Sequence, residues 1–187
     1  NSSNTAMNGE TLAAENPYST LVGEWWEENV GPCNIITSGL ENLTSINACM
    51  RVDYDVLQHK PDVVFLDFSV QDAIGGQGNS NAIGFDNLIR RILDFKTAPA
   101  VVTLLLTGAD QTTYTMNHKN ASIFVSASKS HKRVSQHYDL PILDFETSAW
   151  DNFTELVKVT TKKEIPLVSW DIIGLNNIAM NDTGHAI

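Results

Sequence analysis

The sequence predicts a three-layer α/β/α sandwich on a mainly parallel sheet. Two apolar runs, at 62–70 and 100–106, have the continuous hydrophobicity typical of strands that are covered on both faces. Stretches with apolar residues at helical spacing alternate with these runs, and such alternation favours crossover helices between parallel strands. With 187 residues, 42% of them hydrophobic, the chain suits a single domain with its own core.

The first third of the chain predicts a helix, a short strand and a second helix. Residues 1–17 are polar and typical of a loop, whereas 18–29 repeat apolar residues at helical spacing, including Trp25 and Trp26. The β-branched segment 34–37 predicts a strand. The second helix is expected to begin at Thr44 or Ser45 and end near residue 59, with Ile46, Met50 and Leu57 on its inner face.

The remaining elements continue the alternation. Segment 62–70 predicts a strand that is followed by a glycine-rich turn at 75–78. The further helices are expected at 82–96, at 121–138, at 149–157 and from residue 183, and the further strands at 100–106 and 141–145. The helix at 82–96 is expected to bury Ile83, Leu88, Ile89, Ile92 and Leu93.

Charge and motif content exclude several functional classes. The net charge of −10 with scattered Lys and Arg argues against a nucleic-acid partner, which needs a clustered basic face. No apolar run approaches the roughly 20 residues that span a bilayer. The absence of a Cys/His cluster argues against a metal site, and the turn at 75–78 lacks the lysine of a phosphate-binding loop. We therefore expect neither a metal nor a cofactor.

Five glycosylation sequons indicate a secreted or extracellular glycoprotein. The two cysteines, Cys33 and Cys49, can form a disulfide in such a protein or remain two thiols, and the sequence leaves both possibilities open. The sequon asparagines are Asn1, Asn42, Asn120, Asn152 and Asn181.

Several segments together resemble bacterial and algal SGNH (GDSL-type) hydrolases. They follow the family's order over nearly the whole chain and comprise 24–28, 51–57, 60–70, 137–141 and 181–187. The resemblance implies one domain over 1–187 that lacks the family's first central strand and the end of its last helix. The missing strand is then expected to come from chain outside this numbering, either in the same molecule or in a partner such as a second copy of the chain.

The family resemblance implies a serine-esterase mechanism in which a histidine activates the serine. The first block aligns Ser3 with the nucleophile, although Asn, Ser and Met replace glycines of its sharp turn. Asn42 aligns with a glycine that donates to the oxyanion. Gln71 aligns with an asparagine donor and is one methylene longer.

Two registers fit the last block. In the first, Asp182 and His185 have the spacing of the catalytic Asp-x-x-His dyad. In the second, which we favour because it matches four neighbouring residues, the catalytic positions fall on Asn176 and Ala179. Neither of these side chains can act as a general base.

The sequence therefore predicts an extracellular pseudoenzyme with an SGNH-hydrolase fold, used for binding or assembly. One alternative is an active esterase that acts on carbohydrate or lipid esters through Ser3, Asp182 and His185. Another is a lectin-like module that binds carbohydrate. We expect structural roles for His131 and His137 on their helix, for Trp25 and Trp26 in helix packing, and for Asp72, which is expected to hold backbone after a strand.

Overall fold

The computed structural model describes residues 18–40, 43–75, 79–106 and 123–145. These residues fall into two compact units: 18–40 belong to the first, and the other three ranges belong to the second. The loop expected at 1–17 and the helices expected at 149–157 and from residue 183 lie outside the described residues. The single domain over 1–187 and the partner-supplied strand stay predictions.

The first unit contains helix α1 (Tyr18–Asn29), as its apolar spacing predicts. Gly23 is buried, and a Cβ there would lie 3.0 Å from Cγ1 of Ile35. Trp25 is 57% exposed, whereas Trp26 is partly buried. The strand expected at 34–37 is wrong, since 31–40 form no regular element. A strand needs a hydrogen-bonded neighbour, and among the described residues of this unit the only other element is α1.

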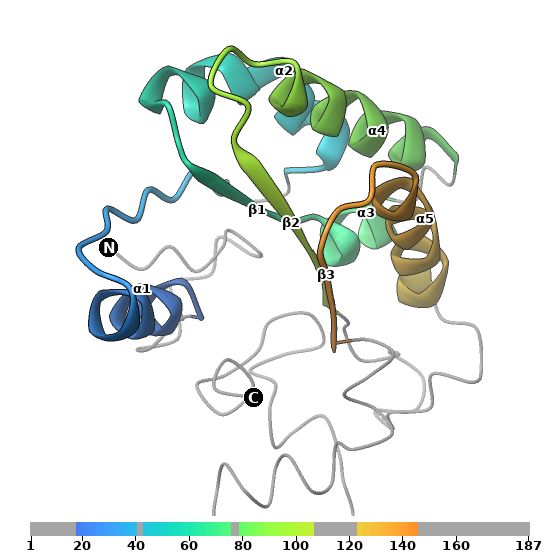
Figure 1. The fold of residues 1–187 in the computed structure, drawn as a ribbon. Coiled ribbons are helices and arrows are strands. Elements are labelled where there is room, and N and C mark those ends of the chain that lie inside the picture. Colours follow the sequence, from blue (N-terminus) through green and yellow to red (C-terminus); the bar gives the residue numbers. More distant parts are fainter. Residues whose placement is uncertain (1–17, 41–42, 76–78, 107–122, 146–187) are drawn as a thin grey trace, which may run out of the picture. The chain divides into compact units, whose positions relative to one another are not determined.

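The second unit is built on a parallel sheet in the order β1-β2-β3. Val63 pairs with Ala100 and Leu66 with Thr103, while Thr103 pairs on its other side with Ile142. The strands are β1 (Val63–Asp67), β2 (Ala100–Leu105) and β3 (Ile142–Asp144). The α/β class with a parallel sheet is thereby confirmed (Figure 1).

Helices connect and cover these strands. They are α2 (Ser45–Asp55), the 3₁₀ turn η1 (Leu57–His59), α3 (Ser69–Ile74), α4 (Asn79–Leu93) and α5 (Ile123–His137). The expected helix to residue 59 ends early, because Val56 leaves the helical region and turns Leu57 into the core. The expected strand at 62–70 also ends early: its last residues start α3, and Gly75 caps that helix.

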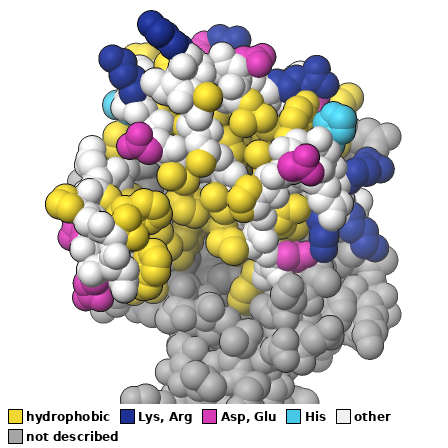
Figure 2. Space-filling view, viewed as in Figure 1, with side chains coloured by type: hydrophobic (Ala, Val, Ile, Leu, Met, Phe, Trp, Pro, Cys, Tyr) yellow, Lys and Arg dark blue, Asp and Glu magenta, His cyan; other side chains and the backbone are white. Residues whose placement is uncertain are grey.

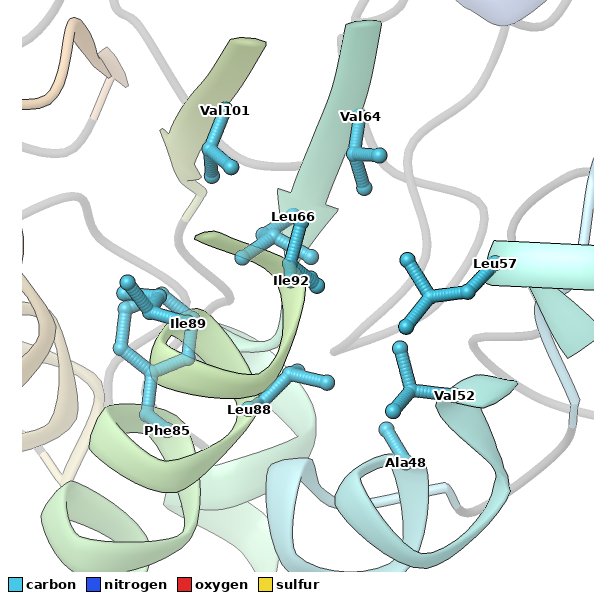
Figure 3. Close-up of a cluster of buried hydrophobic side chains, with 10 residues drawn as sticks. All are labelled: Ala48, Val52, Leu57, Val64, Leu66, Phe85, Leu88, Ile89, Ile92 and Val101. Carbon is cyan, nitrogen blue, oxygen red and sulfur yellow. The ribbon is translucent and has the colours of Figure 1, made fainter. Parts of the chain in front are cut away.

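The core lies between one face of the sheet and the helices α2 and α4, which run side by side (Figure 1). Figure 3 shows β1 and β2 contributing Val64, Leu66 and Val101 to this cluster. The helices contribute Ala48, Val52, Leu57, Phe85, Leu88, Ile89 and Ile92.

Two residues expected in this core are exposed instead. Met50 is 74% exposed and Ile83 is 62% exposed, because α2 turns Ala48 and Val52 inward and α4 turns Phe85, Leu88 and Ile92 inward.

The opposite face of the sheet carries apolar side chains that remain accessible. Phe65 is 39% exposed, and Leu143 on β3 is 57% exposed. In the view of Figure 2, Lys and Arg side chains lie in several separate places rather than in one basic patch. None of the helices in the described ranges is both long enough and apolar enough to cross a membrane.

Candidate site at the strand carboxyl ends

Parallel α/β folds bind ligands beyond the carboxyl ends of their strands, and the described residues there are closely tied together. β1 ends at Asp67, and α3 begins two residues later at Ser69. The Ser69 hydroxyl donates to the Leu106 carbonyl (2.8 Å) and accepts from the Leu106 amide (2.9 Å). The start of α3 is therefore fixed to the chain that leaves β2.

Asp72, in the first turn of α3, is the centre of a buried polar network. Its Oδ1 accepts a hydrogen bond from the Ser45 amide (2.8 Å), and its Oδ2 lies 2.6 Å from the Ser45 hydroxyl. The Nε2 of His131 lies 2.8 Å from the same Oδ2. All three side chains are at most 1% exposed. Asp72 thus joins α3 to the first residue of α2 and to the middle of α5.

The Asp72 carboxylate provides a hydrogen-bond acceptor for the Ser45 amide at the start of α2. The first amides of a helix have no partner within the helix, and a negative charge beside them is favourable. Thr44 precedes the helix, but its side chain does not cap it; the hydroxyl bonds Asn47 instead (2.7 Å). The carboxylate of Asp72 takes the capping position. Asp72 therefore holds backbone, as expected, but backbone 27 residues away.

His131 is held from two sides. Its ring is stacked on Phe85 with centroids 4.0 Å apart and an interplanar angle of 9°. Its Nδ1 is buried and has no hydrogen-bond partner among the described residues. Because a carboxylate accepts and does not donate, the contact to Asp72 is made by a protonated Nε2.

The order of these groups excludes Ser45 as a triad nucleophile. In a catalytic triad the histidine lies between the serine and the carboxylate, so that it can take the hydroxyl proton. Here the carboxylate of Asp72 lies between Ser45 and His131. The network can hold segments together, but it cannot generate an attacking alkoxide on Ser45.

Asp67 is a titratable group at the same sheet edge. One carboxylate oxygen, Oδ2, is buried and has no hydrogen-bond partner among the described residues. Burial raises the pKa of Asp67 from its ordinary value of 3.8 to about 7. This carboxyl group therefore changes charge near neutral pH.

A groove between α2 and α4 is a weaker candidate. Its charged lining includes Arg91, which forms an ion pair with Asp53 across the groove. Arg90, also in the lining, pairs with Asp86 at 3.0 Å. Because these cations already have partners, the groove offers no ready site for an anion.

Of the residues that the sequence predicts for catalysis, Gln71 lies in a described segment. It is 7% exposed on α3, directly before Asp72. The other predicted site residues lie outside the described residues: Ser3, Asn42, Asn176, Ala179, Asp182 and His185, together with the sequons at Asn1, Asn120, Asn152 and Asn181.

The cysteines Cys33 and Cys49 are both free thiols in the structure. Each is partly buried, and Cys33 lies 3.7 Å from the Gly23 carbonyl of its own unit. A disulfide between them is one of the two possibilities that the sequence leaves open.

Sequence reasoning missed the link between Ser45, Asp72 and His131. The available signal was a histidine among the inward positions of an amphipathic helix, since a buried imidazole needs a polar partner. Nothing in the sequence indicates which carboxylate supplies it, because the two residues are 59 positions apart.

The described strands and helices define a parallel α/β fold. No protein-family model matches the sequence, and no curated protein matches it. Among solved structures, a two-domain esterase active on acetylated mannans is similar, with a TM-score of 0.68 and 24% identity over 90% of this chain. An acetyl xylan esterase matches with a TM-score of 0.71 and 17% identity over 91% of this chain and 86% of its own.

An α/β hydrolase from the metagenome of Lake Arreo, Spain, matches with a TM-score of 0.70 and 15% identity, covering 97% of this chain and 81% of its own. The chain spans only 39% of the length of the mannan-active esterase. The similarity confirms the esterase-type α/β fold that the sequence motifs suggested.

Proposed function

We propose that this protein is a serine ester hydrolase that removes acetyl groups from carbohydrate. The observation that carries the proposal is the fold shared with esterases over nine-tenths of the chain, in structures described as active on acetylated mannans or xylan. The sequence resemblance aligns Ser3 with the nucleophile, and in the first of its two registers it makes His185 and Asp182 the dyad. Gln71, buried next to the Asp72 network, is assigned as an oxyanion donor.

The reaction follows from these assignments. The Ser3 hydroxyl attacks the acetyl carbonyl while His185 accepts its proton, and amide donors such as the Gln71 carboxamide stabilise the oxyanion. Collapse of the intermediate expels the sugar oxygen, which takes the proton from His185. Water then attacks the acetyl-serine by the same route and releases acetate.

The test is acetate release from acetylated mannan and acetylated xylan by the purified full chain. Ser3→Ala is expected to reduce the rate by at least about 10³-fold, the scale set by loss of a triad nucleophile. Ser126→Ala, at an exposed serine of α5 outside the assigned site, serves as the matched control and is expected to stay within about twofold. Equal rates for wild type and Ser3→Ala would contradict the proposal.

A second candidate is an extracellular binding glycoprotein without catalysis, including a lectin-like form. The alignment of Asn176 and Ala179 with the dyad favours it, because neither residue accepts a proton. Five sequons support an extracellular location, and Asn42 coincides with an oxyanion position. A glycan on Asn42 would be bulky enough to fill an acyl site.

Glycopeptide mass spectrometry of native material separates the two functions. The binding protein is expected to carry a glycan on Asn42, bind deacetylated mannan and release no acetate. An unmodified Asn42 beside glycosylated Asn120 and Asn152 would favour the esterase.

A further inference from the structure

We infer that Asp72, Ser45 and His131 are positioning residues that hold Gln71, the assigned oxyanion donor on α3, in place. The inference rests on the proposed function, since it assigns a task to residues that themselves touch no substrate. It starts from one juxtaposition: Asp72 directly follows Gln71, and Ser45 begins the helix that the Asn42 segment leads into.

The helix that carries Gln71 is too short to hold its own position. α3 has six residues, and isolated helices of that length are unstable in water. It must therefore be fixed by tertiary contacts. Asp72 supplies two such contacts, one to α2 and one to α5, and the Ser69 hydroxyl bonds to Leu106 supply a third.

A packing contact supports the same alignment at the other end of α3. A Cβ on Gly75 would lie 3.0 Å from Cγ2 of Thr44 and 3.3 Å from the Gln71 carbonyl. The chain before α2 and the last turn of α3 therefore lie in close contact. Together with the Asp72 bonds, this contact holds Thr44 and Ser45, at the start of α2, against α3, which carries Gln71.

His131 completes the arrangement from α5. A buried carboxylate is costly unless donors surround it, and removal of one partner leaves the charge undercompensated. With the imidazole stacked on Phe85 and hydrogen-bonded to Asp72, the carboxylate has one defined position. Without the imidazole, Oδ2 keeps the Ser45 hydroxyl but loses its donor on α5, so that α3 loses this tie to α5.

Useful oxyanion donors lie within narrow distance limits, and loss of one such donor costs about 10²–10³ in kcat. A shift of α3 is therefore expected to lower kcat while substrate binding, made elsewhere, changes little.

Two variants of His131 distinguish a role in positioning α3 from a general contribution to protein stability. His131→Phe keeps a ring on Phe85 but removes the hydrogen bond, whereas His131→Gln retains an N–H donor.

A matched control lies on α5, the helix that carries His131. The hydroxyls of Ser135 and Thr103 are 2.8 Å apart and fully buried, and their hydrogen bond ties α5 to β2. Ser135→Ala therefore removes a buried hydrogen bond of similar worth, about 1 kcal/mol, that has neither partner on α3.

For the full chain acting on acetylated mannan, we expect His131→Phe to lower kcat by about 30-fold with KM within about twofold. We expect His131→Gln to recover most of that loss and Ser135→Ala to stay within about twofold. Equal losses of kcat in His131→Phe and Ser135→Ala would overturn the inference, as would a loss confined to KM.

Amide hydrogen exchange tests the same claim without turnover. In His131→Phe the amides of Ser45 and Gly75 are expected to lose at least about tenfold in protection, and in Ser135→Ala they are expected to keep it. If the wild type releases no acetate, the proposed function fails, and the exchange data alone decide on positioning. Unchanged or uniformly lowered protection in His131→Phe then rejects it.

Discussion

Gly84 of α4 lies directly against Ile46 of α2: a Cβ on Gly84 would be 2.4 Å from Cγ1 of Ile46, 2.9 Å from its amide nitrogen and 3.0 Å from its Cα. Two of these three atoms are backbone, so no change of side-chain rotamer removes the overlap. The two helices therefore approach each other as closely as they do because residue 84 has no side chain.

Gly84→Ala is expected to destabilise the protein by about 1 kcal/mol. Alanine is favoured over glycine inside a helix by about 1 kcal/mol, but overpacking against fixed backbone costs about 1–3 kcal/mol and parts α2 from α4. Urea unfolding of the variant measures the difference. Asn87→Ala, at an exposed position of the same helix, is the control and is expected to change stability by less than about 0.5 kcal/mol. A Gly84→Ala protein as stable as wild type would contradict the contact.

Ile89 and Ile83 are expected to differ sharply when truncated. Ile89 is 0% exposed in the core cluster, whereas Ile83 is 62% exposed on the same helix. Ile89→Ala should cost about 3 kcal/mol, because it removes buried methylenes and leaves a cavity, and Ile83→Ala should cost under about 0.5 kcal/mol. Equal effects in chemical denaturation would show that the core face of α4 is assigned incorrectly.

The carboxyl group of Asp67 is expected to make stability depend on pH. Its pKa is about 7 in the folded protein against an ordinary value of 3.8, so the folded state holds the proton longer than the unfolded state. Stability should then fall as pH rises from about 4 to 7 and level off above 7.

Asp67→Asn removes this titration and keeps the side-chain size. Relative to wild type, it should gain on the order of 4 kcal/mol at pH 8, because each pKa unit between 3.8 and about 7 is worth roughly 1.4 kcal/mol, and nothing at pH 4. Denaturant titrations at both pH values measure the difference. A gain that is the same at both pH values would be inconsistent with titration of Asp67.

Tyr138 links the end of α5 to α4. Its hydroxyl donates to Asp86 (2.7 Å) and accepts from Nε of Arg90 (2.7 Å). Tyr138→Phe is expected to cost about 1 kcal/mol in thermal or urea unfolding, since the cluster is partly solvated. Tyr54→Phe, at a side chain that is 75% exposed, is the matched control and should be neutral. If the two variants proved equally stable, the cluster would contribute nothing to the fold.

The sequence predicts helices and strands well where burial of one face imposes a regular spacing of apolar residues. The runs around Val64 and Val101 become neighbouring parallel strands, and α1 and α5 fall close to their expected bounds. The misses occur where local spacing competes with tertiary contacts. Segment 69–74 continues an apolar run but becomes a helix, with the Ser69 hydroxyl bonded to Leu106 and the Asp72 carboxylate to Ser45.

The candidate site is less predictable than the fold for a physical reason. The motif alignment identifies Gln71 as a site residue, and Asp72 is the next residue in the sequence. The hydrogen bonds of Asp72 reach 27 residues back to Ser45 and 59 residues forward to His131, and no local pattern specifies such pairs. Ser3, Asp182 and His185 remain assignments by resemblance, and the acetate-release assay addresses them directly.

The large sequence separation between Asp72 and His131 also affects folding during synthesis of the chain. Domains are synthesised from the N-terminus, and contacts between distant residues form late. Until residue 131 of 187 has been added, the carboxylate lacks its imidazole donor and Phe85 lacks the ring that covers it. A nascent chain halted between β2 and α5 therefore lacks both the ring that stacks on Phe85 and the α5 donor to the Asp72 carboxylate.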